Sequence, residues 1–155
     1  MNIFFDAISL LISADNDLLM IVGLSLWVSL IAVVVATLIG MPLGAATALY
    51  KFPGRKILVV ILNALMGLPP VVVGLLVYML LSRSGPFGVL GLLFSPSAMI
   101  IAQTILIIPI IAALSRQIID DLWVEYAEQL TSLGASPIRR MMTLLWDGRF
   151  SLLTA

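Results

Sequence analysis

The 155-residue chain contains no cysteine and no histidine. Without cysteine it has no disulfide and no thiolate nucleophile, and without both residues it lacks the usual ligands of zinc. Histidine is also the side chain best suited to proton transfer near neutral pH. The two absences remove the usual groups of most enzyme classes, so we expect no catalytic residue, no metal site and no cofactor.

Charged side chains are scarce as well. They form 10% of the sequence, against roughly 25% in soluble proteins, and eight basic residues balance eight acidic ones. Hydrophobic residues form 62%, where about 45–50% is usual. So few polar residues cannot cover a surface in water, which predicts contact with the lipid bilayer. The zero net charge, without a basic run, predicts no nucleic-acid binding.

The N-terminal segment, residues 1–17, contains no lysine or arginine, and Asp6 interrupts its apolar stretch. It therefore lacks the form of a cleavable signal peptide. We interpret it as an extracytoplasmic or interfacial segment, with a short apolar helix from about Ile3 to Ile12 at the membrane surface.

Three windows without charge are long enough to cross a bilayer, which takes about 20 apolar residues. The predicted spans cover about residues 18–50, 57–82 and 98–115, and a loop rich in glycine, proline and serine precedes the third. We therefore expect an all-α, polytopic transmembrane protein whose transmembrane domain extends over residues 18–155.

The positions of lysine and arginine set the expected orientation, because cytoplasmic loops keep positive charge. The loop of residues 51–56 carries three basic residues, and the segment of about 116–149 carries four. The N-terminal tail has none, and the loop after the second span has Arg83 alone. We expect a multi-pass protein of the cell (inner) membrane, with its N-terminus outside and residues 116–149 in the cytoplasm.

Small residues recur at every fourth position of the first span, at Ala32, Ala36, Gly40, Gly44 and Ala48. Such a ladder lets another helix approach closely, which favours helix packing. The alternative is that the ladder lines a transport pathway. Pro42 lies beside it and predicts a bend.

The second span contains Asn63, Gly67, Pro69 and Pro70. Two adjacent prolines interrupt a helix interior, so this span should break near mid-membrane. A broken span is typical of a cavity or gate, which makes these four residues pathway or gate candidates. The alternative is a structural kink buried against a neighbour, with Asn63 in an interhelical hydrogen bond.

The third span contains the polar residues Gln103 and Thr104, and Pro109 follows them. Either helix packing or a pathway would explain these residues. No charged residue lies inside any of the three predicted spans. Because proton- or ion-coupled carriers usually hold ionisable residues at membrane depth, a secondary transporter loses support.

The cytoplasmic segment predicts two helices. Residues 120–133 form a helix with acidic residues in its first turns, and Gly134 ends it. Ser136 followed by Pro137 predicts the start of a second helix, which extends to residue 146. This helix-turn-helix is either a solvated connection or a surface that docks into a partner's groove.

The cytoplasmic segment resembles that of the permease subunits of ATP-binding-cassette importers, which carries the pattern Glu-Ala-Ala-x3-Gly-x9-Ile-x-Leu-Pro. Glu128 and Gly134 fit its core spacing, and Leu144 falls on the Ile position. Gln129-Leu130 stand at the two alanines and Trp146-Asp147 at the Leu-Pro. The resemblance implies docking on an ATP-binding cassette subunit through a coupling loop that includes Glu128, Leu133, Gly134, Ala135 and Ser136.

A second resemblance, carried by residues 63–74 and 81–86, is to the tungstate permeases, which are relatives of the molybdate and sulfate permeases. It implies a type I importer permease in which two copies, as a homodimer, form a pathway with alternating access. An extracytoplasmic oxyanion-binding protein would deliver the anion. Such permeases continue for about two more spans, so we expect a C-terminally incomplete permease that lacks the spans covering its small-residue ladder.

The chain has no Gly-x-x-x-x-Gly-Lys phosphate loop, so we expect ATP hydrolysis on a separate subunit. The sequence thus favours the permease of an oxyanion importer, for tungstate before molybdate or sulfate. A structural membrane protein is the first alternative. Co-purification with an ATPase would distinguish the permease from it. A membrane enzyme is the second, but its only acidic cluster, Asp120, Asp121, Glu125 and Glu128, has a helical setting that suggests surface charge.

Overall fold

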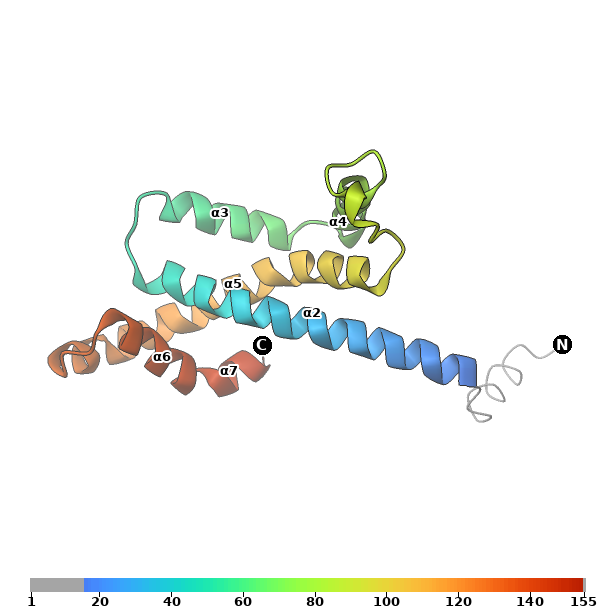
Figure 1. Ribbon diagram of the computed structural model, residues 1–155. Helices are drawn as coiled ribbons and strands as arrows, with labels where there is room; N and C mark the ends of the chain where they lie inside the picture. The colour runs from blue at the N-terminus through green and yellow to red at the C-terminus, as the bar shows by residue number, and fades with distance from the viewer. Residues whose placement is uncertain (1–15, 155) are drawn as a thin grey trace.

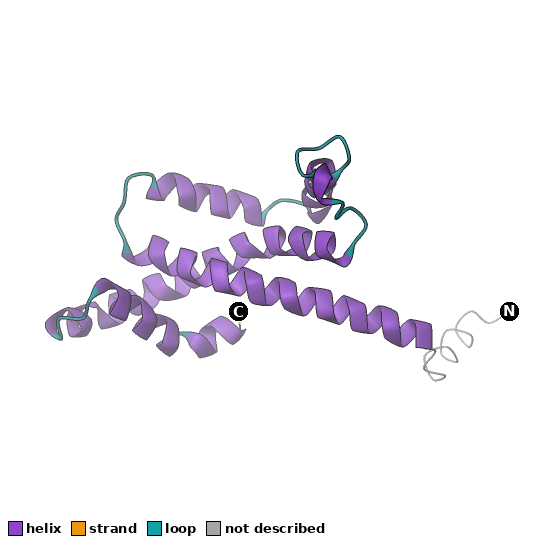
Figure 2. Ribbon diagram, in the orientation of Figure 1, coloured by secondary structure: helices purple, strands orange, loops and turns teal. Residues whose placement is uncertain are grey.

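The computed structural model describes residues 16–154, and its regular structure is entirely helical (Figure 2). The helix expected at residues 3–12 lies outside the described residues. The helices, labelled as in Figure 1, are α2 (Asn16–Leu49), α3 (Arg55–Met66), α4 (Pro70–Leu81), α5 (Pro96–Ser132), α6 (Pro137–Asp147) and α7 (Arg149–Thr154), with a short 3₁₀ helix at Gly88–Leu90. The expected all-α fold is confirmed.

Two helices, α2 and α5, are each long and apolar enough to cross a membrane. The pair α3 and α4 meets the same condition only when taken together, and it is bent by 104°. In Figure 1, α2 and α5 run in the same direction. Helix α3 runs in the opposite direction, from the end of α2 toward the start of α5. The bent pair therefore returns the chain to the end of the molecule where α2 begins, which fits a broken span better than a re-entrant loop.

The small-residue ladder of α2 lies against α5. Ala32 and Ala36 are fully buried. A Cβ atom added at Gly40 would lie 3.1 Å from the carbonyl oxygen of Ile108, and one added at Gly44 would lie 2.3 Å from that of Ala112. The absence of larger side chains thus allows the two helix backbones to approach closely. The expectation that this face awaits missing spans is wrong, because α5 of the same chain covers it.

Helix α5 extends well past residue 115, where we expected the third span to end. It is one helix of 37 residues, with Pro109 inside it and no acidic residue in its first turn. The prediction of a separate cytoplasmic helix with acidic residues in its first turns is therefore wrong. The physical reason is that residues 110–133 contain no glycine or proline, so nothing interrupts the helix where hydropathy falls.

Helix α6 turns back along α5 and packs on it through Leu144. Leu144 is fully buried in a cluster with Ala45 of α2 and Ile119 of α5. Helix α2 itself continues through Pro42 without interruption. The packing of α6 on both long helices fixes the position of the turn between α5 and α6.

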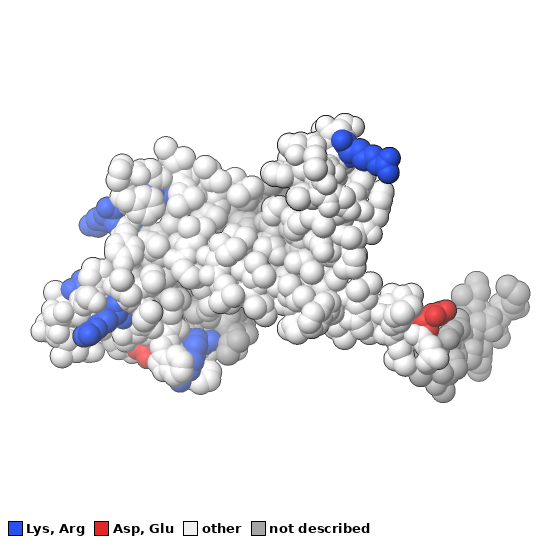
Figure 3. Space-filling model, in the orientation of Figure 1, with Lys and Arg blue, Asp and Glu red and all other residues white. Residues whose placement is uncertain are grey.

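Basic residues gather at the end of the molecule that holds the α2–α3 loop and α6 (Figure 3). The α4–α5 loop, with Arg83, lies at the opposite end, near the start of α5. This uneven distribution agrees with the charge pattern from which we predicted the orientation.

Candidate functional site

The turn between α5 and α6 is built around Gly134, whose φ angle is +63°. The Gly134 amide donates to the Thr131 carbonyl at 3.0 Å, and the Ala135 amide donates to the Leu130 carbonyl at 3.1 Å. These two bonds form a Schellman motif, which requires the left-handed backbone that glycine adopts readily. The helix end predicted at Gly134 is confirmed.

The start of α6 also follows the sequence pattern. Ser136 occupies the N-cap position with an extended backbone, and Pro137 is the first helical residue. The Ser136 side chain makes no capping hydrogen bond. Its contribution is therefore the backbone conformation that precedes a proline.

Arg140 holds this turn in place, a role that the sequence did not reveal. Its Nε atom donates to the Ala135 carbonyl at 2.8 Å. Its guanidinium carbon lies 5.7 Å from the centre of a Trp123 ring on α5. One side chain of α6 thus contacts both the turn and α5. The only sequence signal was an arginine within one turn of a proline at a helix start.

The predicted coupling residues lie on the surface of this turn. Glu128, Gly134 and Ser136 are exposed, Ala135 is half-buried, and Leu133 is 80% exposed. On α6, exposed apolar residues recur at every fourth position, at Ile138, Met142 and Trp146. We call these three residues the apolar docking face, and Leu133 adds a further exposed apolar side chain at the end of α5. A helix with one apolar face on the core and another facing outward is suited to bind a groove in a partner.

The residues of the resembled pattern divide between core and surface. Leu144, at the Ile position, is buried and anchors α6. Gln129 is exposed, and Trp146 is exposed beside Arg149, whose guanidinium carbon lies 4.4 Å from the ring centre. The departures at Gln129 and Trp146 therefore lie outside the buried cluster, and the anchoring position is kept as an apolar residue.

The break predicted in the second span is confirmed. Residues 67–69 separate α3 from α4, with Pro69 extended at the N-cap of α4 and Pro70 as its first residue. Asn63, Gly67, Pro69 and Pro70 are all exposed. Asn63 forms no side-chain hydrogen bond with any described residue. Residues 16–154 therefore provide no partner for the interhelical hydrogen bond that we considered as the alternative. These candidates therefore lie on the surface of the described chain.

Two polar residues of α5, Thr104 and Ser115, are buried instead. Thr104 and Ser115 belong to the buried face that also includes Ala112 and Ile119. Within the described chain, Gln103 Oε1, Thr104 Oγ1 and Ser115 Oγ are buried atoms without a hydrogen-bond partner. Of the two interpretations that we left open, the position of Thr104 favours helix packing.

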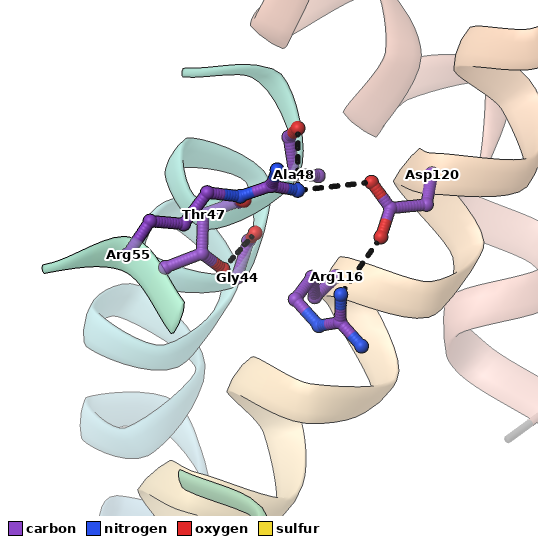
Figure 4. A network of polar contacts seen from close by, with 6 residues as sticks. All are labelled: Gly44, Thr47, Ala48, Arg55, Arg116 and Asp120. Atoms are coloured by element: carbon purple, nitrogen blue, oxygen red, sulfur yellow. Dashed lines mark hydrogen bonds and ion pairs between the residues drawn. The ribbon is translucent and has the colours of Figure 1, made fainter. Parts of the chain in front are cut away.

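A polar network joins the end of α2, the start of α3 and the middle of α5 (Figure 4). Arg55 donates to the carbonyls of Thr47 and Ala48 in the last turn of α2, and its Nη2 atom lies 3.7 Å from Oδ1 of Asp120. Asp120 also accepts a 3.0 Å hydrogen bond from Arg116. Arg55 thus satisfies carbonyls that a helix end leaves unpaired, and Asp120 ties it to α5.

The network was not predictable from the sequence pattern. Arg55 counted only toward the charge of its loop, and Asp120 only toward an acidic helix start and the acidic cluster. Among the described residues, no group of three or more His, Cys, Asp or Glu side chains is placed to hold a metal ion.

Known proteins resemble this chain over most of its length. The family described as "Binding-protein-dependent transport system inner membrane component" matches residues 36–146. A "Probable anion ABC transporter permease protein" of Haloferax volcanii is 33% identical over 138 residues, which are 89% of this chain and 60% of that protein.

Two further relatives are each named "Tungstate uptake system permease protein TupB". That of Peptoclostridium acidaminophilum is 34% identical over 92% of this chain and 62% of its own length. That of Campylobacter jejuni is 34% identical over 97% of this chain and 63% of its own length. The chain thus spans about 60% of the length of these curated relatives.

No solved structure matches the chain. The family match covers both long helices from the middle of α2 onward, the bent pair and the turn at Gly134. With its apolar helices, the chain is a multi-pass membrane protein, and it belongs to the family of binding-protein-dependent transport system inner membrane components.

Proposed function

We propose that this chain is the permease subunit of an ATP-driven importer that moves an oxyanion into the cytoplasm by alternating access. The observation that carries the proposal is the similarity to two tungstate uptake permeases over 92% and 97% of the chain. Tungstate is therefore the first candidate. Molybdate and sulfate are the alternatives, because they are tetrahedral dianions of the same charge.

The coupling role is proposed for the turn around Gly134 and the apolar docking face. Leu133 and Trp146 are exposed apolar side chains on a segment that the basic residues suggest is cytoplasmic, where a protein partner would cover them. Helix α5 is continuous from its membrane-spanning part to this turn. A displacement of the turn would therefore move the whole helix. An ATP-binding subunit bound here could therefore change the packing of α5 against α2.

The pathway is proposed to form between two copies of the permease. Asn63, Gly67, Pro69 and Pro70 are exposed at the bend of the second span, so a second copy could face them. A bent span whose backbone is freed at mid-membrane is a suitable gate. An extracytoplasmic binding protein would deliver the anion at the end where α2 begins.

The near absence of charge at membrane depth fits this division of labour. The described spans place no basic side chain in their interior that would hold a dianion tightly. Binding would then belong to the delivery protein and energy to the ATPase, while the permease supplies a passage with two states. Residues 1–17 form an outer segment in this proposal, and the cytoplasmic part begins within α5, near residue 116.

The test is transport in proteoliposomes that contain this chain, its ATPase and the oxyanion-binding protein. We expect ATP-dependent uptake of labelled tungstate, which unlabelled tungstate inhibits more strongly than molybdate or sulfate. Stronger inhibition by molybdate or sulfate would reassign the substrate. Co-purification with the ATPase but no ATP-dependent uptake of any of the three anions would overturn the transport function and leave a structural role.

A further inference from the structure

A groove between the start of α3 and the middle of α5 combines basic and apolar residues. Arg55, Lys56 and Arg116 line it together with Val59 and Val60, around a volume of about 360 Å³. We call it the cationic groove. It lies beside the network of Figure 4, at the end of the molecule where α2 passes into α3.

The cationic groove carries excess positive charge. Asp120 is the one carboxylate that the described ion pairs bring to it, and Arg55 and Arg116 share this group. Lys56 is exposed and forms no ion pair with a described residue. Three positive side chains thus face one negative one, so the groove is suited to bind an anion.

Donors in the cationic groove are also free to bind. Arg116 contacts Asp120 through Nη1, and Arg55 uses Nε and Nη2 for its contacts. Within the described residues, no hydrogen bond uses Nη2 of Arg116 or Nη1 of Arg55. Guanidinium groups with free donors bind phosphate oxygens well.

The depth of the cationic groove indicates which anion it binds. The apolar helix α2 ends at Leu49, and the first basic residue follows at position 51. With the bilayer core ending where the apolar stretch of α2 ends, the groove's charges would lie at the level of lipid headgroups. Val59 and Val60 lie about one helical turn further along α3, and Val60 is 66% exposed. Aliphatic surface thus begins where the acyl chains of a lipid would begin.

We infer that the cationic groove binds one anionic phospholipid, with its phosphate beside Lys56 and Arg116 and an acyl chain along Val59 and Val60. A free oxyanion would pair with the same cations but would leave the valines uncovered. A phospholipid covers both parts, so the observations favour the lipid. The inference concerns a resident lipid of this chain and does not depend on which ion the importer moves.

The experiment is native mass spectrometry of the purified chain, released from micelles with equal amounts of phosphatidylglycerol and phosphatidylcholine. We expect the chain to retain phosphatidylglycerol in preference to phosphatidylcholine. In Lys56→Gln, retention of phosphatidylglycerol should fall about fivefold, the effect of one basic residue near an anionic lipid surface. Lys56→Arg should keep the wild-type retention, and circular dichroism should show the same helix content in all variants.

The matched control is Arg83→Gln, which removes one exposed basic residue from the opposite end of the molecule. It should leave the retention unchanged. An equal fall in Arg83→Gln, or none in Lys56→Gln, would overturn the inference, because binding would then follow overall charge or another surface. Displacement of phosphatidylglycerol by tungstate at constant ionic strength would also overturn it, since the groove would then bind the free oxyanion.

Discussion

Among single residues, Gly134 has the strictest backbone requirement in the proposed coupling loop. Its φ angle is +63°, and a Cβ atom built on it meets nothing within 4 Å. The effect of a substitution therefore comes from the backbone conformation and not from a clash. A valine resists the left-handed region by about 1–2 kcal/mol or more, whereas asparagine visits it more readily.

We predict that Gly134→Val lowers association with the ATPase subunit and ATP-dependent uptake, while insertion and abundance stay near wild type. The reason is that the Schellman motif would open and α6 would leave its place on α5. Co-purification and uptake assays measure the two effects. Gly134→Asn is the control and should retain most of both activities. Normal association and uptake in Gly134→Val would show that the turn is an ordinary connection.

Asp120 is the second residue with a specific expectation, since its carboxylate serves both Arg55 and Arg116. We predict that Asp120→Asn lowers the free energy of unfolding by less than about 1 kcal/mol, because the pairs are partly exposed to solvent. High salt should lower the stability of the wild-type protein by about this amount, because it screens the ion pairs. It should leave the stability of the variant nearly unchanged. Thermal unfolding at two salt concentrations measures the difference.

Asp121→Asn is the matched control, because Asp121 is exposed and forms no ion pair within the described chain. It should change neither the unfolding temperature nor its dependence on salt. If both variants behaved alike, the contact of Asp120 with the two arginines would contribute nothing to stability.

Between elements, the α2–α5 contact depends on close approach at Gly44. A Cβ atom there would lie 2.3 Å from the Ala112 carbonyl and 2.8 Å from the Ser115 Cβ atom. Because the carbonyl belongs to the backbone of α5, no side-chain rotation can relieve the clash. We predict that Gly44→Ala lowers the free energy of unfolding by about 1–3 kcal/mol, measured by thermal unfolding in nanodiscs.

Gly23→Ala on the same helix provides the comparison. A Cβ atom at Gly23 meets nothing within 4 Å, so alanine should add helix propensity and raise stability by up to about 1 kcal/mol. The two substitutions are chemically identical and should act in opposite directions. Stabilisation by Gly44→Ala would mean that α2 and α5 do not pack as closely as the structure has them.

For the whole molecule, the prediction concerns topology. The parallel course of α2 and α5 implies that the bent pair crosses the membrane (Figure 1). Single cysteines at positions 54 and 136 should then be labelled from the cytoplasm, and one at position 84 from outside. The cysteine-free sequence gives a clean background. A membrane-impermeant thiol reagent, added to intact cells and to inverted vesicles, makes the measurement.

The outcome at position 84 separates two topologies. Labelling of positions 54 and 84 from the same side would mean that α3 and α4 form a re-entrant loop. Labelling of position 136 from outside would remove the turn around Gly134 from contact with any cytoplasmic ATPase and would overturn the coupling role.

The sequence alone determined the features that depend on local physics. Hydropathy marked α2, α5 and the bent pair as membrane segments. The prolines at 69 and 70 located the break, and Gly134 and Pro137 located the turn between α5 and α6. Each of these follows from the backbone preferences or the solvation of a few neighbouring residues, so a short window of sequence contains the information.

Only the tertiary structure decided what lies opposite these elements. The charge boundary at Arg116 marks where the apolar stretch ends, but helix α5 continues, because hydrogen bonding along a helix does not depend on hydropathy. Arg55 meets Asp120, and Leu144 meets Ala45, across many intervening residues. Such contacts depend on how whole helices pack, and the covering of the small-residue ladder by α5 follows from the same packing.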